Sequence, residues 1–376
     1  MEAELPSSEG DRRETSETGS ARRRSADLEP ARHGEQRRLW KPALVLFKLG
    51  VLALIVWLTV RILQGLDWSA LGRRVRDAGA PWVALAVAAM IARYLVWVGR
   101  WRAALRSAGI AVAGWLSLGS LLASAAVNSV TPTARVFGGL LRARYLASSQ
   151  GARSFGHVYG TVLYDQLQHQ VVMGLLSVVA VILLGARLGF GWLVIGGSAM
   201  AVLAGLGAWK WRQLTDRQGG SWLESLTARL AEKAVERPAG SRRAALLEHG
   251  RDAVDTMRRL LVLRSLNVRA LLLGVAYFLV NAGAQWLAFR AIDAEVAYLT
   301  IVVVVALGTF AGFLAGTPGG MGAAEGAMIA AFVGLQVERV DATAGTLLFR
   351  GIHYLVTFGL GLPFLVVLEL RHRRAS

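Results

Sequence analysis

The sequence has 376 residues, of which 54% are hydrophobic, and it carries a formal net charge of +17 with no cysteine. Soluble globular chains are roughly 45–50% apolar, and here the excess lies in long runs separated by arginine-rich connections. The lack of cysteine excludes disulfides, thiolate metal sites and a cysteine nucleophile in this chain. Because no polar segment is large enough for a nucleic-acid-binding domain, we attribute the positive charge to membrane orientation and contact with anionic lipid.

Residues 1–40 are polar, so we expect a disordered, basic N-terminal tail. Apolar runs follow, most of them long enough to cross a bilayer. They cover 42–63, 82–104, 111–131, 155–184, 190–209, 270–290, 296–316, the short 323–336, and 343–369. The predicted fold class is all-α: a polytopic transmembrane helix bundle of about eight or nine membrane segments within 41–370, followed by a basic tail at 371–376.

One sizeable polar segment, 210–269, separates the fifth and sixth runs. Its apolar residues recur three and four positions apart, and Pro238 marks a turn near its middle. We expect an insertion of two amphipathic helices that form a hairpin on the cytoplasmic face. It is too small and too poor in catalytic groups to be an enzyme domain.

Charge predicts the topology. The basic N-terminus, the 210–269 insertion and the C-terminal tail are expected on the cytoplasmic side of the cell (inner) membrane. This scheme requires 111–153 to enter and leave on one side as a re-entrant hairpin. It also places Arg73, Arg74 and Arg76 outside, in conflict with the positive-inside rule.

Two segments, 128–146 and 314–328, break the apolar pattern in the same way. In each, a Thr-Pro pair ends an apolar run and precedes small residues and glycines: Thr131-Pro132 in the first and Thr317-Pro318 in the second. Broken helices inside a bilayer are tolerated where they line a cavity, and paired breaks in two halves of a chain indicate a substrate site. The helix N-termini after the prolines would point toward an anionic group such as a lipid phosphate. An ordinary kink or a tight interhelical loop is the alternative.

Ionisable residues near the breaks are the next candidates. Glu325 lies in an apolar run, and Arg135 and Arg142 follow the first break, while Arg350 lies in the last span. A charge at membrane depth costs several kcal/mol unless it is paired or hydrated, so each is a candidate functional residue. We expect Glu325 to pair with Arg350 or with Arg135. A purely structural ion pair is the alternative.

The fourth span carries a polar stripe, with His157, Thr161, Asp165 and His169 spaced by four. Asp165 and His169 could relay protons or contact a headgroup, and interhelical hydrogen bonding is the plainer interpretation. Two ligands one turn apart are a weak metal signal, so no metal is predicted. Asn281 and Gln285 share the spacing, and for them we expect only interhelical hydrogen bonds.

The run TPGGMGAAEGAMIAAFVGL followed by LLFRGIHYLVTF resembles the lysylphosphatidylglycerol synthase transmembrane-region family, also described as flippase-like membrane proteins. The matching positions are Pro318, Gly319, Gly320, Gly322, Glu325, Gly326 and Arg350. The first broken segment is similar to the family's N-terminal element at Pro132, Gly138, Gly139 and Arg142, with Leu140 where some members carry an acidic residue. The resemblance implies a lipid-translocase-like membrane region without the soluble domain that transfers lysine from tRNA.

The sequence therefore predicts a lipid translocase that binds and moves an anionic, aminoacylated or polyprenyl-phosphate lipid, with no cofactor and no nucleic-acid partner. A membrane-embedded transferase acting on lipid-linked substrates, with Glu325 or the Asp165–His169 pair as base, is one alternative. An accessory subunit that docks a soluble or membrane synthase is another. No ATPase, zinc-protease or nucleophile-elbow motif is present, so no catalytic residue is predicted. The predicted substrate-binding residues are Thr131, Pro132, Arg135, Arg142, Asp165, His169, Thr317, Pro318, Gly319, Gly320, Glu325 and Arg350.

Overall fold

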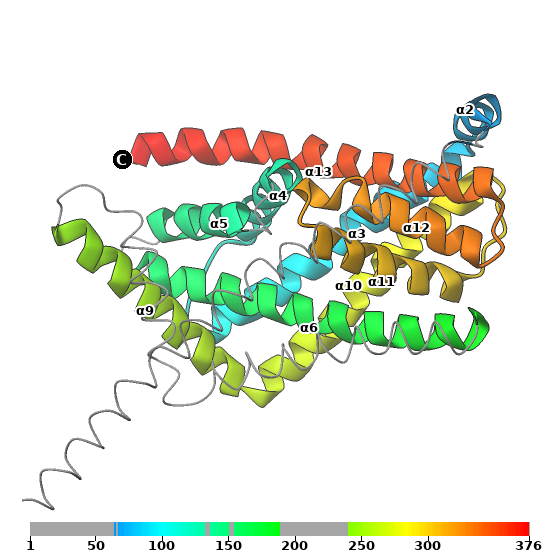
Figure 1. The fold of residues 1–376 in the computed structure, drawn as a ribbon. Coiled ribbons are helices and arrows are strands. Elements are labelled where there is room, and N and C mark those ends of the chain that lie inside the picture. The colour runs from blue at the N-terminus through cyan, green and yellow to red at the C-terminus, as the bar shows by residue number, and fades with distance from the viewer. Residues whose placement is uncertain (1–63, 65–66, 132–135, 150–153, 189–239, 376) are drawn as a thin grey trace, which may run out of the picture. The chain divides into compact units, whose positions relative to one another are not determined.

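The computed structural model describes Gln64 and residues 67–131, 136–149, 154–188 and 240–375. These residues form helices and no strand occurs among them, which confirms the predicted all-α class. Figure 1 shows the helices in chain order. Five are long and apolar enough to cross a membrane: α3 (Ala80–Ser107), α6 (Phe155–Leu188), α10 (Arg264–Ala291), α11 (Tyr298–Ala315) and α13 (Arg339–Ala375). The N-terminal tail and the expected spans 42–63 and 190–209 lie outside the described residues.

The remaining helices are shorter. They are α2 (Trp68–Arg76), α4 (Gly114–Val130), α5 (Val136–Ser149), α9 (Gly240–Val262) and α12 (Ala323–Gly334), with a 3₁₀ turn η1 (Pro318–Gly320). At 1.5 Å per residue, α4, α5 and α12 are about 26, 21 and 18 Å long. None of these three lengths reaches the roughly 30 Å of a bilayer's hydrocarbon core, and each of the three helices borders a predicted break.

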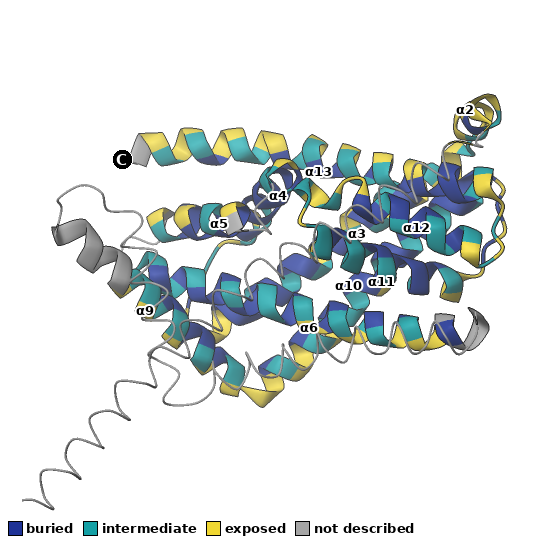
Figure 2. Cartoon of the chain, in the orientation of Figure 1, coloured by how far each residue is buried: buried dark blue, intermediate teal, exposed yellow. Residues whose placement is uncertain are grey.

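Close helix packing builds the core. α3 lies along α10, while α13 packs against α4. Small residues permit this approach, since a Cβ added to Gly361 of α13 would lie 2.6 Å from the carbonyl oxygen of Leu122 in α4. Figure 2 shows buried residues where helices face one another and exposed ones on the outward faces. Leu272 and Leu355 lie on those faces, with 65% and 67% of their surface exposed, as expected of side chains that face lipid tails.

Most of the described part of the 210–269 insertion is α9, which packs along α6. A Cβ on Gly160 of α6 would lie 2.5 Å from the carbonyl oxygen of Ala253, so glycine allows the two backbones to meet. The last residues of the 210–269 segment, from Arg264 onward, belong to α10. The α9–α10 junction falls at Leu263, which is the N-cap residue of α10.

In the first loop, one of the three arginines that conflict with the positive-inside rule has an ion-pair partner. This loop forms α2, which Asp67 caps by accepting hydrogen bonds from the amides of Ser69 and Ala70. Arg74 of α2 pairs with Asp341 at the start of α13 (3.3 Å) and donates to the carbonyl oxygen of Ile292 (3.1 Å). Arg74 therefore ties α2 to the helix ends beside it.

Candidate functional site

The second predicted break is present and depends on glycine. α11 ends at Ala315, and α12 begins only at Ala323. Between them Gly316, Gly319, Gly320 and Gly322 all have positive φ, at 66°, 58°, 73° and 78°. Residues with a side chain rarely adopt positive φ. The glycines of the TPGGMG motif and the preceding Gly316 therefore permit the turn.

The first break separates α4 from α5, and Pro132 and Arg135 lie in its part outside the described residues. The two helices pack against each other. The side-chain oxygen of Asn128 in α4 accepts a hydrogen bond from the amide of Gly138 in α5 (3.0 Å). A Cβ on Gly138 would lie 2.5 Å from the carbonyl oxygen of Ser124, so this glycine is needed for the contact.

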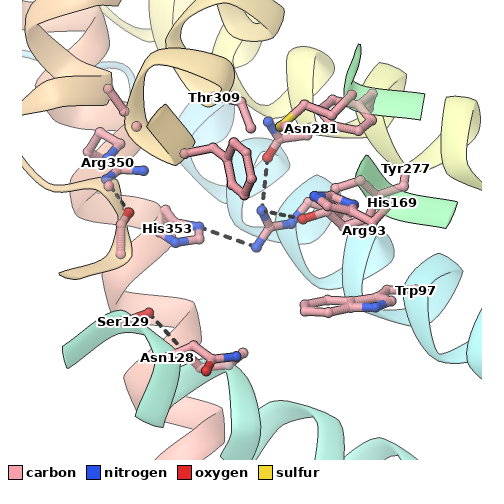
Figure 3. Close-up of a pocket in the computed structure, with 18 of the residues that line it drawn as sticks. Arg93, Trp97, Asn128, Ser129, His169, Tyr277, Asn281, Thr309, Arg350 and His353 are labelled. Carbon is pink, nitrogen blue, oxygen red and sulfur yellow. Dashed lines mark hydrogen bonds between the residues drawn. The ribbon is translucent and has the colours of Figure 1, made fainter. Parts of the chain in front are cut away.

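The two breaks meet at one cavity. A Cβ on Gly319 would lie 3.0 Å from the carbonyl oxygen of Ser129, which places the η1 turn against the end of α4. Thr131, Thr317, Gly319 and Gly320 line a cavity of about 180 Å³ between these segments. Figure 3 shows its polar lining. Of the predicted site residues, His169 and Arg350 also line it.

The predicted pairing of Glu325 with Arg350 is confirmed. Arg350 Nε donates to the Glu325 carboxylate, and its Nη2 donates to the Tyr354 hydroxyl (2.7 Å) and to the carbonyl oxygen of Gly319 (3.3 Å). Arg350 thus holds the turn and the start of α12 against α13. Because Glu325 lies in the first turn of α12, a carboxylate already stands near the positive end of that helix. The Glu325 carboxylate balances the charge of Arg350, which lines the cavity, although Glu325 itself is not among the lining residues.

The residue that dominates the cavity chemically is Arg93, which was not among the predicted site residues. It lies near the middle of α3, about 20 Å from the first residue of the helix, and only 5% of its surface is exposed. Its Nη1 donates to Asn281 (3.0 Å) and Tyr277 (3.3 Å), and its Nη2 is 3.2 Å from His353 Nδ1. Figure 3 shows these side chains converging on the guanidinium group.

No Asp or Glu forms an ion pair with Arg93 among the described residues. An arginine N–H can only donate, so His353 Nδ1 must accept, and that ring is then neutral with its proton on Nε2. A lone arginine at the centre of a membrane helix costs about 2.5–3.5 kcal/mol on insertion scales. Arg93 is therefore a functional candidate by the same argument that singled out Glu325.

Asp165 and Arg142 were predicted to meet substrate, and in the structure they form an ion pair with each other. Asp165 is 1% exposed and lies 2.8 Å from Arg100 Nε and 3.4 Å from Arg142 Nη1. The indole N–H of Trp97 also donates to Asp165 (2.9 Å), while the Trp97 side chain lines the cavity. Asp165 and Arg142 are not among the cavity's lining residues, so the cluster borders the site without facing into it.

The polar stripe on α6 serves several contacts. His157 is hydrogen-bonded to Thr256 of α9, and Thr161 accepts from the Trp101 indole, so this part of the stripe has the expected interhelical role. Asn281 was expected to make only an interhelical hydrogen bond, yet its partner is Arg93 and it lines the cavity.

The charges around the cavity do not cancel. The described charged groups at or beside it comprise three buried arginines (Arg93, Arg100 and Arg142), the partly buried Arg350, the buried Asp165 and the partly buried Glu325. The local balance is therefore positive and favours an anion. Within the described part of the chain, no group of three or more His, Cys, Asp or Glu residues could hold a metal ion.

Known proteins agree with the motif analysis. Residues 45–361 match the family described as Lysylphosphatidylglycerol synthase TM region. A UPF0104 membrane protein from Methanothermobacter thermautotrophicus is 25% identical over 295 residues, which cover 76% of this chain and 85% of that protein. The family match spans both breaks and the Arg93 cavity, and the chain belongs to the lysylphosphatidylglycerol synthase transmembrane-region family of membrane proteins.

Proposed function

We propose that this protein binds the headgroup of an anionic membrane lipid between its two interrupted segments and carries that headgroup across the cell membrane. The observation that supports this proposal is the shared cavity, where the end of α4 and the Gly316–Gly322 turn meet beside a buried, unneutralised arginine. Lipid tails can stay in the bilayer during such a movement. The polar headgroup cannot cross unaided, because hydrocarbon offers it no hydrogen bonds.

The depth of the cavity supports the proposal. Arg350 lies about 16 Å from the first residue of α13, and Arg93 lies about 20 Å from the first residue of α3. With the starts of α3 and α13 placed at the membrane surface, as we propose, both residues lie inside a hydrocarbon core that is roughly 30 Å thick. A polar cavity at this depth suits a group in transit between leaflets, as in transporters whose sites are built from discontinuous helices.

The size of the cavity limits what enters it. Sites for drug-sized ligands occupy roughly 300–1,000 Å³, whereas this cavity measures about 180 Å³. It accommodates a small headgroup and leaves the acyl chains outside. Exposed lining residues, Phe313 and Gly319, provide a side along which those chains could lie.

The orientation of the protein is part of the proposal. Arg144 in the second half of α5 is hydrogen-bonded to His372 near the end of α13, and Arg371 stacks on Trp115 at the start of α4. These basic helix ends therefore lie together, and we place them on the cytoplasmic side. A reporter enzyme that is active only outside the cytoplasm, fused after Ser376, should be inactive.

Purified protein in liposomes tests transport. Fluorescent phosphatidylglycerol, reduced from outside by an impermeant quencher, should become fully accessible within minutes in proteoliposomes, whereas about half stays protected in protein-free vesicles of the same composition. Heat-denatured protein at the same density is the control for leakage. An exchange rate equal to that of empty vesicles, for every anionic lipid tried, would refute the proposal.

A further inference from the structure

Among the residues that the structure describes, the hydrogen-bonding partners of Arg93 are all uncharged. Asn281, Tyr277 and His353 come from α10 and α13, and they hold the two terminal nitrogens of the guanidinium group. The aromatic faces of Tyr94 and Tyr277 lie 4.6 and 5.3 Å from its central carbon. These contacts fix the orientation of the group, and no carboxylate in the described segments compensates its positive charge.

The guanidinium group also keeps an unused donor. Arg93 Nε is buried and has no hydrogen-bond partner among the described residues. A buried donor without an acceptor is costly in a protein interior, and a ligand that supplies the missing acceptor explains it best. Planar guanidinium groups bind oxyanions with two parallel hydrogen bonds, so a phosphate oxygen is the natural acceptor.

The other arginines at or beside the cavity all lie against a carboxylate, although Arg100 and Arg142 share one and do not line the cavity. Glu325 pairs with Arg350, and Asp165 pairs with Arg100 and lies close to Arg142. His353 is neutral when it accepts from Arg93. Of the charged residues that line the cavity, Arg93 is therefore the one in the described part of the chain whose charge is open to a ligand.

We propose that Arg93 is the anion-binding residue of the cavity and that its ligand presents a single negative charge, as a phosphodiester does. This inference rests on the proposed function and narrows the lipids that it can serve. A phosphodiester neutralises one arginine, whereas a phosphomonoester carries about −1.5 to −2 at pH 7 and would leave buried negative charge. A glycerophospholipid headgroup therefore fits better than a polyprenyl monophosphate.

Binding to the purified full-length protein tests the proposal, with native mass spectrometry as the readout. The probes are a short-chain phosphatidylglycerol, a short-chain phosphatidic acid and inorganic phosphate. The variants are Arg93→Gln and Arg93→Lys, with Arg106→Gln as the matched control, because Arg106 lies on the same helix and is exposed at its end. Arg93→Lys keeps the charge, so it remains informative should Arg93→Gln fold poorly.

We expect Arg93→Gln to weaken phosphatidylglycerol binding about tenfold or more, the usual effect of losing one hydrogen bond to a charged group. Arg93→Lys should retain part of the affinity, and Arg106→Gln should bind like the wild type. Wild-type affinity in a folded Arg93→Gln protein would overturn the role of Arg93. Equal or tighter binding of phosphatidic acid would overturn the single-charge rule. Displacement of the lipid by equimolar inorganic phosphate would overturn the proposal that the bound anion is a lipid headgroup.

The same variants separate this inference from the proposed function. Leaflet exchange that continues unchanged in Arg93→Gln liposomes would overturn the role of Arg93 and leave transport intact. Arginine-dependent lipid binding without any leaflet exchange would overturn transport and support the binding site.

Discussion

Replacing Asp165 by Asn should destabilise the protein, because two buried arginines share this carboxylate as their ion-pair partner. Asp165 is buried and accepts hydrogen bonds from Arg100 Nε (2.8 Å), Trp97 Nε1 (2.9 Å) and Arg142 Nη1 (3.4 Å). The amide keeps the shape of the side chain and removes its charge. Two cations then remain in a buried cluster with no carboxylate.

The expected loss in the free energy of unfolding is about 3–5 kcal/mol, the usual cost of breaking a buried ion pair from one side. This is a large part of the roughly 5–15 kcal/mol that stabilises a typical folded protein. Arg142→Gln should cost less, because Asp165 keeps its nearer partner Arg100. The order of stability is therefore wild type, then Arg142→Gln, then Asp165→Asn.

Reversible unfolding in detergent micelles, followed by tryptophan fluorescence, measures this order. Glu295→Gln is the control, since Glu295 is 89% exposed and 3.6 Å from Arg290, and exposed pairs contribute about 0–1 kcal/mol. If Asp165→Asn unfolded at the wild-type midpoint and lost only lipid binding, the carboxylate would serve the ligand rather than the fold, and our reasoning would be refuted.

Two further predictions concern packing at the breaks and at α9. Gly160→Ala should destabilise the protein by about 1–3 kcal/mol, because the new Cβ would press on the Ala253 carbonyl oxygen. Gly174 lies on the same helix, and a Cβ there meets nothing within 4 Å, so Gly174→Ala should stabilise the protein by up to about 1 kcal/mol. Thermal unfolding of the two variants shows whether the two changes have opposite signs. Asn128→Ala should lower the free energy of unfolding by about 1–3 kcal/mol, because the buried amide of Gly138 loses its hydrogen-bond acceptor. Hydrogen exchange at the start of α5 should then become faster. Unchanged exchange there would contradict this role of Asn128.

The breaks could be predicted from the sequence because proline and glycine act locally. The TPGGMG motif encodes a turn through backbone geometry alone, and its three glycines and the preceding Gly316 do adopt positive φ. The Glu325–Arg350 pair was also accessible, because isolated charges in apolar runs have few possible partners. The all-α class followed from the length of the apolar runs.

The surroundings of Arg93 in the cavity could not be predicted in the same way. The partners of Arg93 lie 184, 188 and 260 residues further along the chain, and no local pattern reports such contacts. Asn281 and Gln285 are four residues apart on one helix, a spacing common to polar residues that form interhelical hydrogen bonds. The position of Asn281 at the cavity is therefore visible only in three dimensions. The available signal was Arg93 itself, an arginine inside an apolar run, to which the rule applied to Glu325 also applies.

A lipid that labels its own binding site tests the central claim most directly. Phosphatidylglycerol with a photoactivatable group on its headgroup can be reconstituted with the wild-type protein, illuminated and traced by mass spectrometry of the peptides. We predict adducts on residues that line the cavity, from Ala125 to Thr131 and from Gly312 to Gly320, which unlabelled phosphatidylglycerol suppresses. Adducts confined to outward-facing positions such as Leu272 and Leu355 would contradict the account.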